Sequence, residues 1–121
     1  MRNYQVFGGA LRSDIEFPEL RPLESDAPSW TLRSTPLVPD MTSAILLGEA
    51  EVIPGCQVRL FHHDDGFRFI FDDTGICDIT DHGRDIAWSK GPAAEPEWVR
   101  ADVTGRVLAV AAALERGSAH P

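Results

Sequence analysis

The stretch from Cys56 to Lys90 constrains the fold most, because apolar and polar residues alternate in it through four successive runs. The runs read QVRLFHH, FRFIF, ICDIT and DIAWS, and the sequences DDG, DDTG and DHGRD separate them. Alternation with a period of two is typical of a half-buried strand, and aspartate and glycine are favoured in tight turns. These residues therefore predict an antiparallel β-meander.

The turns of the meander also predict its register. If Asp65 and Gly66 form a two-residue loop, Leu60 faces Phe71 on the next strand. If Asp73 to Gly75 form a three-residue loop, Phe71 pairs with Cys77, which becomes a buried thiol. Asp78 then lies on the opposite face. Both registers give one face of the sheet an apolar set of Leu60, Phe67, Phe69 and Phe71.

The residues before the meander predict shorter strands and an irregular crossing. Strand patterns occur at Tyr4–Phe7, Ala10–Ser13 and Trp30–Thr35. The acidic segment from 14 to 30 contains three prolines and predicts a mostly solvated crossing. The segment from 41 to 52 contains the short apolar run AILL, which is compatible with a helix or a strand, so both remain open.

The C-terminal part of the chain changes to a helical period. Over residues 97–116 apolar residues recur at spacings of three and four, which predicts an amphipathic helix. We expect Pro96 in its first turn and Gly117 as its C-terminal cap. The apolar stripe is expected to pack on the phenylalanine face of the meander. A glycine inside a helix is costly, so Gly105 is expected to mark a close approach to the sheet.

Length and composition favour one soluble domain over residues 1–121, with a β-rich part at 1–90 and a tail at 118–121. The expected fold class is α+β, an antiparallel β-meander sheet packed against one C-terminal amphipathic helix. The formal net charge of −8 disfavours nucleic acid and anionic membranes, because lysine and arginine drive binding to both. Neither a signal sequence nor a long apolar run occurs, so we expect a cytoplasmic protein.

Two turns rich in histidine and aspartate, HHDDG and DHGRD, supply candidate metal ligands. The residues are His62, His63, Asp64, Asp65, Asp81, His82 and Asp85. Adjacent residues of a strand point to opposite faces, so His62 and His63 are not expected to reach one ion without a bulge. This geometry argues against a metal site that uses both His62 and His63. A small metal-dependent enzyme that uses His62, Asp64, Asp65 and His82 is the alternative function.

Motifs of high catalytic specificity do not occur in the sequence. It contains no GxSxG, HExxH, GxGxxG or P-loop pattern, and Cys56 and Cys77 are too far apart for a metal-binding pair. We therefore expect no catalytic residue and no cofactor, and two reduced thiols. Trp98 and Arg106 are the candidate interface residues, because we expect both near the exposed side of the helix and the sheet edge.

The segment YQVFGGALRSDIEFPEL, residues 4–20, resembles the opening of HPr-kinase-like proteins. That family has a Y-x-x-F/Y-G-L-x-I-x-S-[DE] type of segment, continued by an apolar stretch and P-E-L, before a β-rich leading domain. The strand DIAW, the proline-containing link after it and the helix that finishes in ALERG are similar to the family as well. The resemblance covers essentially the whole chain.

The resemblance implies an accessory domain without the catalytic core. In the family a P-loop kinase core follows, whereas only SAHP follows ALERG here and no ATP or magnesium motif is present. We therefore expect a non-catalytic binding or regulatory domain that pairs with itself, with a separate kinase core, or with another protein or peptide. An open sheet edge and exposed helix surface would favour such pairing. A truncated kinase remnant without its own activity is the other alternative.

Overall fold

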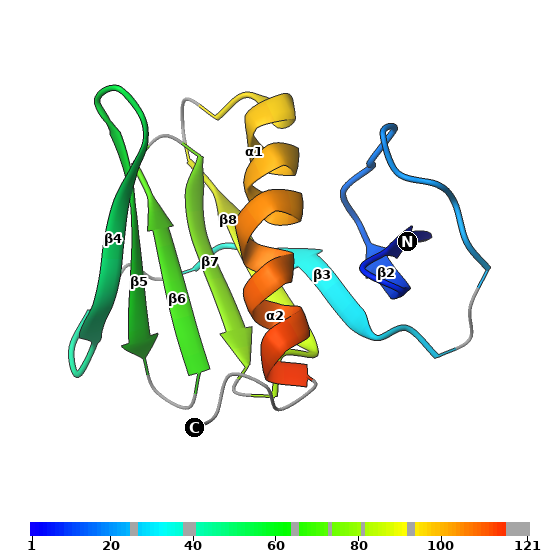
Figure 1. The fold of residues 1–121 in the computed structure, drawn as a ribbon, viewed down its shortest axis with the longest axis horizontal. Coiled ribbons are helices and arrows are strands. Elements are labelled where there is room, and N and C mark those ends of the chain that lie inside the picture. The colour runs from blue at the N-terminus through cyan, green and yellow to red at the C-terminus, as the bar shows by residue number, and fades with distance from the viewer. Residues whose placement is uncertain are drawn as a thin grey trace.

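The computed structural model describes residues 1–24, 27–37, 41–63, 66–72, 74–80, 82–91 and 94–115, which form one mixed sheet of eight strands and one interrupted helix (Figure 1). The strands are β1 (Arg2–Val6), β2 (Gly9–Ser13), β3 (Trp30–Ser34), β4 (Ile45–Ile53), β5 (Cys56–His63), β6 (Gly66–Phe71), β7 (Gly75–Thr80) and β8 (Asp85–Lys90). The helical segments are α1 (Pro96–Asp102), the π-helical turn η1 (Val103–Val107) and α2 (Leu108–Glu115). The expected α+β class is confirmed.

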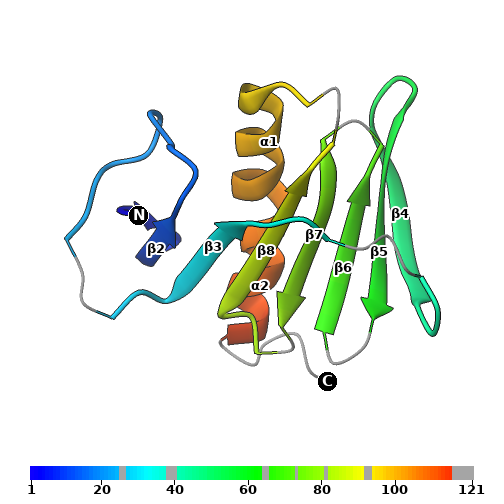
Figure 2. The same ribbon diagram turned by 180° about the vertical axis from the view of Figure 1, so that it is seen from behind.

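The order of strands in the sheet is β1-β2-β3-β8-β7-β6-β5-β4. Strands β4 to β8 pair antiparallel with their neighbours in sequence, which confirms the predicted meander. The segment that was open between helix and strand is therefore a strand, and it lies at the edge of the sheet. Strand β3 pairs parallel with both β2 and β8, so it joins the N-terminal hairpin to the meander (Figure 2).

The predicted pairings of the meander were wrong by two residues at both turns. Leu60 pairs with Phe69, and Phe71 pairs with Gly75. Gly66 and Gly75, which the sequence assigned to loops, lie in strands β6 and β7. Glycine is needed at both positions for lack of space: a Cβ on Gly66 would overlap the carbonyl oxygen of Ile79, and a Cβ on Gly75 would overlap the carbonyl oxygen of Ser89. A shift of two residues keeps every side chain on its predicted face, so the apolar face was predicted correctly.

The helix packs on this apolar face of the sheet (Figure 1). Pro96 begins it, as expected. Its inward residues are Val99, Val103, Val107, Leu108, Ala111, Ala112 and Leu114, which are all buried. They join one core with Phe69, Phe71, Cys77, Ile79, Ile86 and Trp88 from the meander. The predicted packing of helix on phenylalanine face is therefore confirmed, with Phe67 only half-buried at its margin.

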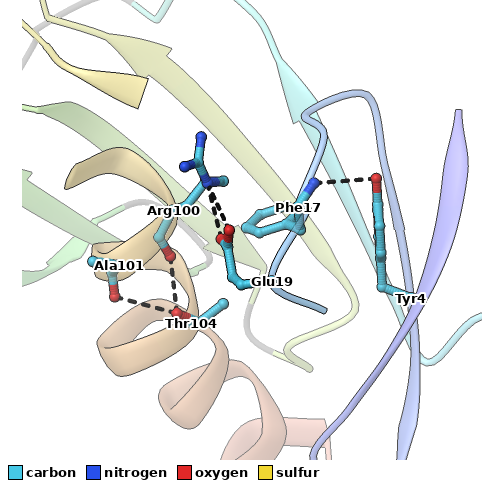
Figure 3. Close-up of polar contacts among 6 residues, drawn as sticks. All are labelled: Tyr4, Phe17, Glu19, Arg100, Ala101 and Thr104. Atoms are coloured by element: carbon cyan, nitrogen blue, oxygen red, sulfur yellow. Dashed lines mark hydrogen bonds and ion pairs between the residues drawn. The ribbon is translucent and has the colours of Figure 1, made fainter. Parts of the chain in front are cut away.

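The helix is not the continuous α-helix that the period predicted for 97–116. A π-helical turn interrupts it at Val103–Val107, and the hydroxyl of Thr104 donates a hydrogen bond of 2.9 Å to the carbonyl of Arg100 (Figure 3). Gly105 lies on the exposed side of this turn, and a Cβ there would meet no atom within 4 Å. The expected close approach to the sheet was therefore wrong. The tail at 118–121 and Gly117 lie outside the described residues.

The crossing after β2 is mostly exposed, as expected, but one side chain in it is fully buried. Phe17 packs edge-on against the ring of Tyr4, with 5.6 Å between the ring centroids. Its backbone N–H donates a hydrogen bond of 3.1 Å to the Tyr4 hydroxyl (Figure 3). Nearby, Arg100 on the helix pairs with Glu19 at 2.9 Å. These contacts fasten the crossing to the hairpin on one side and to the helix on the other.

Candidate functional site

The predicted metal ligands do not gather around one point in the part of the chain that the structure describes. His62 is exposed, and its ring packs edge-on against Phe67 at 5.5 Å. His63 lies on the opposite face, as expected from the strand period. His82 lies beyond β7, with its Nδ1 at 3.2 Å from the hydroxyl of Thr80. Among the described residues no three His, Cys, Asp or Glu side chains are placed to hold a metal ion.

Three of the candidate aspartates fall outside what the structure describes. These residues are Asp64, Asp65 and Asp81. Asp85, at the start of β8, is described and exposed. The structure thus places both histidines of the alternative enzymatic site at the ends of strands, each in contact with a neighbouring side chain.

Cys77 is fully buried in the centre of the core and forms no disulfide. Burial away from water, with a smaller contribution from the charge of Asp78, raises the pKa of the Cys77 thiol well above its ordinary value of 9.0. A thiol is a nucleophile only as the thiolate, so Cys77 is an inert core residue. This agrees with its expected role in the apolar face, although its cross-strand neighbours are Phe69 and Trp88.

The raised pKa of Cys77 predicts a loss of stability in alkali. Above about pH 9 the unfolded chain releases the thiol proton, whereas the folded chain keeps it. The contribution of the thiol to the free energy of unfolding is therefore complete below about pH 9 and is lost as the pH rises through the pKa of the folded state. We expect the unfolding free energy to fall as the pH rises above about 9, because the unfolded chain then binds one proton fewer than the folded chain. Urea titrations should show that Cys77→Val removes this slope and that Cys56→Ala keeps it. An equal slope in Cys77→Val would contradict the assignment.

The face of the sheet opposite the helix carries a buried ion pair. The guanidinium of Arg68 donates from Nε and Nη2 to the two carboxylate oxygens of Asp78, at 2.6 and 2.8 Å. Its Nη1 lies 3.8 Å from the sulfur of Met41, which belongs to the connection between β3 and β4. Residues 35–37, which follow β3 in this connection, pass over the outer face (Figure 2). The pair is therefore a structural contact under a covering segment.

A hollow of about 470 Å³ lies beside this ion pair on the outer face. Its lining combines threonines with charged or titratable side chains of both signs, among them Arg33, His63, Asp78 and Asp85. The carboxylate of Asp78 is already held by Arg68. The other polar side chains that line the hollow carry charges of both signs, so together they do not match one class of ligand.

A second hollow, of about 400 Å³, is apolar and lies between the helix and the edge of the sheet. We call it the edge groove. Its floor consists of Val58, Leu60 and Phe69. Strand β4 contributes the small residues Gly48 and Ala50 to one wall. The helix contributes Arg106, Ala109 and Val110 to the other. A mostly apolar hollow of this volume with a few polar groups is the common form of a binding site.

Arg106 is the basic side chain of the edge groove, and it is half-buried there. Within the described residues it makes no hydrogen bond or ion pair, although the chain as a whole carries a formal charge of −8. Glu49, which also lines the groove, is paired with Arg59 at 3.5 Å. Arg106 belongs to the π-helical turn, and such turns are frequent at functional sites. The groove therefore offers a positive charge beside an apolar floor.

Further apolar side chains are exposed around the edge of the sheet. Ile45, Leu46 and Leu47 begin β4 and are each more than half exposed. Trp98, the other interface candidate from the sequence, is 47% exposed on α1. The small residues that shape the groove were not found from the sequence. The apolar run AILL was the available signal, but periodicity does not distinguish a helix from a strand in so short a run.

Comparisons of the chain with protein-family models, curated proteins and solved structures find no match. Among the described residues, no helix has the length and apolar character that crossing a membrane requires. The edge groove and the exposed residues beside it are therefore the observations on which a functional assignment can be built.

Proposed function

We propose that the chain is a non-catalytic binding domain that takes a protein or peptide partner in the edge groove. The observation that carries the proposal is the apolar floor of Val58, Leu60 and Phe69 beside Arg106, a cation that forms no hydrogen bond or ion pair within the described part of the chain. The exposed residues Ile45 to Leu47 begin the same strand, β4, that forms one wall of the groove. Exposed apolar side chains that gather at one edge are typical of an interaction site.

The resemblance of residues 4–20 to HPr-kinase-like proteins supports a regulatory role for this binding. On that reading the domain corresponds to the leading, non-catalytic part of such a protein. Its partner would be a separate kinase core or another protein, and the chain would influence the partner by association and not by chemistry of its own. We also propose that the domain binds its partner without a cofactor.

A peptide selection tests the proposed function. The full chain is immobilised and panned against a random 16-residue peptide library displayed on phage, and the affinity of selected peptides is measured by fluorescence anisotropy. Ala109→Trp fills the edge groove, whereas Ala101→Trp adds the same bulk to another exposed alanine of the helix. We expect Ala109→Trp to weaken binding at least about tenfold, which corresponds to about 1.4 kcal/mol.

The matched variant makes the result specific to the groove. Ala101→Trp is expected to bind the selected peptides as the unmodified chain does, because Ala101 does not line the groove. Peptides that bind both tryptophan variants equally well would place the interaction elsewhere. Failure to select any peptide would also contradict the proposed function.

A further inference from the structure

We infer that the partner segment is an amphipathic α-helix that lies beside α2 and presents a carboxylate to Arg106. The inference rests on the proposed function and specifies the partner of the same groove. Three features of the described residues lead to it. They are the width of the edge groove, the irregular edge of β4 and the charge of Arg106.

The edge groove has the width of one helix. The edge groove crosses from Phe69 on β6 over β5 to Gly48 and Ala50 on β4. Two spacings between strands amount to about 10 Å, and a helix with its side chains is about 10–12 Å across. Both figures show the helix over the other side of the meander, with β4 and β5 beyond it (Figures 1 and 2). A second helix therefore fits next to α2.

The walls of the groove allow a helix to come close. Gly48, Ala50 and Ala109 carry at most one side-chain carbon each, and a Cβ on Gly48 would meet no atom within 4 Å. Packed helices lie about 8–10 Å apart, and the shorter distances require small residues at the contact. The floor then receives the apolar side chains of the incoming helix.

The edge of β4 is poorly suited to the addition of another strand. Its pairing with β5 shifts register between Leu46 and Gly48 and again between Glu51 and Ile53. Glu49 and Glu51 add exposed charges along the same edge. Bulges and charges are the features that protect a sheet edge from pairing with another chain. These features favour a helix in the groove over an extended peptide along the edge.

The charge of Arg106 specifies one side chain of the partner. Arg106, Ala109 and Val110 are three and four residues apart, so they share one side of the helix and line the groove together. A guanidinium at the margin of an apolar groove gains most from a carboxylate, which it can bind through two parallel hydrogen bonds. The incoming helix should therefore carry aspartate or glutamate beside its apolar face. A second copy of this chain would bring a further net charge of −8 to the contact, and repulsion between the two acidic chains disfavours it as the partner.

Selection with a charge reversal tests the inference. The phage library is panned in parallel against the full chain, Arg106→Glu and, as a control, Arg84→Glu, which reverses an exposed arginine outside the groove. Peptides selected on the full chain are expected to carry apolar residues at helical spacing and an acid at one fixed offset. Those selected on Arg106→Glu are expected to carry lysine or arginine at that offset. Arg84→Glu should again select the acid.

Affinities and circular dichroism complete the test. We expect Arg106→Glu to lower the affinity for the acidic peptides at least about tenfold. Replacing the acid at the fixed offset by lysine should restore the affinity for Arg106→Glu. The peptides should gain helical signal on binding. Peptides that bind the groove without an acidic preference, or in an extended form, would overturn the inference and leave the proposed function intact. Dimers of the chain that Ala109→Trp dissociates would assign the groove to a second copy and also overturn it. If no peptide is selected, both the inference and the proposed function fail.

Discussion

Asp78→Ala is expected to lower the free energy of unfolding by about 3 kcal/mol, because it removes the carboxylate that accepts two hydrogen bonds from the buried guanidinium of Arg68. The side chain of Arg68 is only 4% exposed, and Asp78 accepts hydrogen bonds from two of its nitrogens. Breaking a buried pair costs about 3–5 kcal/mol. The lower end applies because the side chain of Asp78 is 33% exposed, so water can reach the site. Urea denaturation followed by tryptophan fluorescence measures the loss.

Two further variants separate the ion pair from a general effect of lost carboxylates. Asp85→Ala removes an exposed carboxylate from the neighbouring strand and should change stability by less than about 0.5 kcal/mol. Arg68→Met combined with Asp78→Ala removes both charges of this pair and should recover part of the loss, since methionine does not need the Asp78 carboxylate. A loss below about 1 kcal/mol in Asp78→Ala would contradict the stabilising role assigned to this ion pair.

Phe17→Ala is expected to cost about 3–5 kcal/mol, the usual range for a large aromatic side chain removed from a core. Phe17 is fully buried and packs against Tyr4, so its loss leaves a cavity between the hairpin and the rest of the fold. The connection from β2 to β3 should become more accessible as a result. Thermal unfolding and limited proteolysis of residues 14–24 measure the two effects.

The exposed phenylalanine at the turn between β1 and β2 is the matched control. Phe7 is 49% exposed, so Phe7→Ala should change stability by less than about 0.5 kcal/mol and leave the proteolysis rate unchanged. If Phe17→Ala is no more destabilising than Phe7→Ala, the crossing is not fastened through Phe17.

Local patterns predicted the meander and its faces well. The alternation in FRFIF and ICDIT identified the strands, and the requirement that Asp78 avoid the apolar face fixed the parity of the register. The exact pairing was missed because glycine was assigned to the turns, as its conformational freedom favours. Gly66 and Gly75 instead lie where a neighbouring backbone leaves no room for a Cβ.

Contacts between distant segments could not be predicted in the same way. The parallel pairing of β3 with β2 and β8 depends on crossings whose sequences contain no pairing signal. Phe17 was missed because prolines and acids surround it, although its aromatic side chain was a sign of burial. Trp98 and Arg106 were selected from their expected surface position. The groove that Arg106 lines depends on the edge position of β4, which follows only from the tertiary structure.

The most direct test of the edge groove is a nuclear magnetic resonance titration of the ¹⁵N-labelled full chain with the tightest peptide selected on it. We predict that backbone shifts concentrate at Gly48, Ala50, Leu60 and the segment from Arg106 to Val110, and that resonances of Thr31, Arg33 and Asp85 around the outer hollow stay in place. Shifts centred on the outer hollow, with the groove resonances unchanged, would contradict the account.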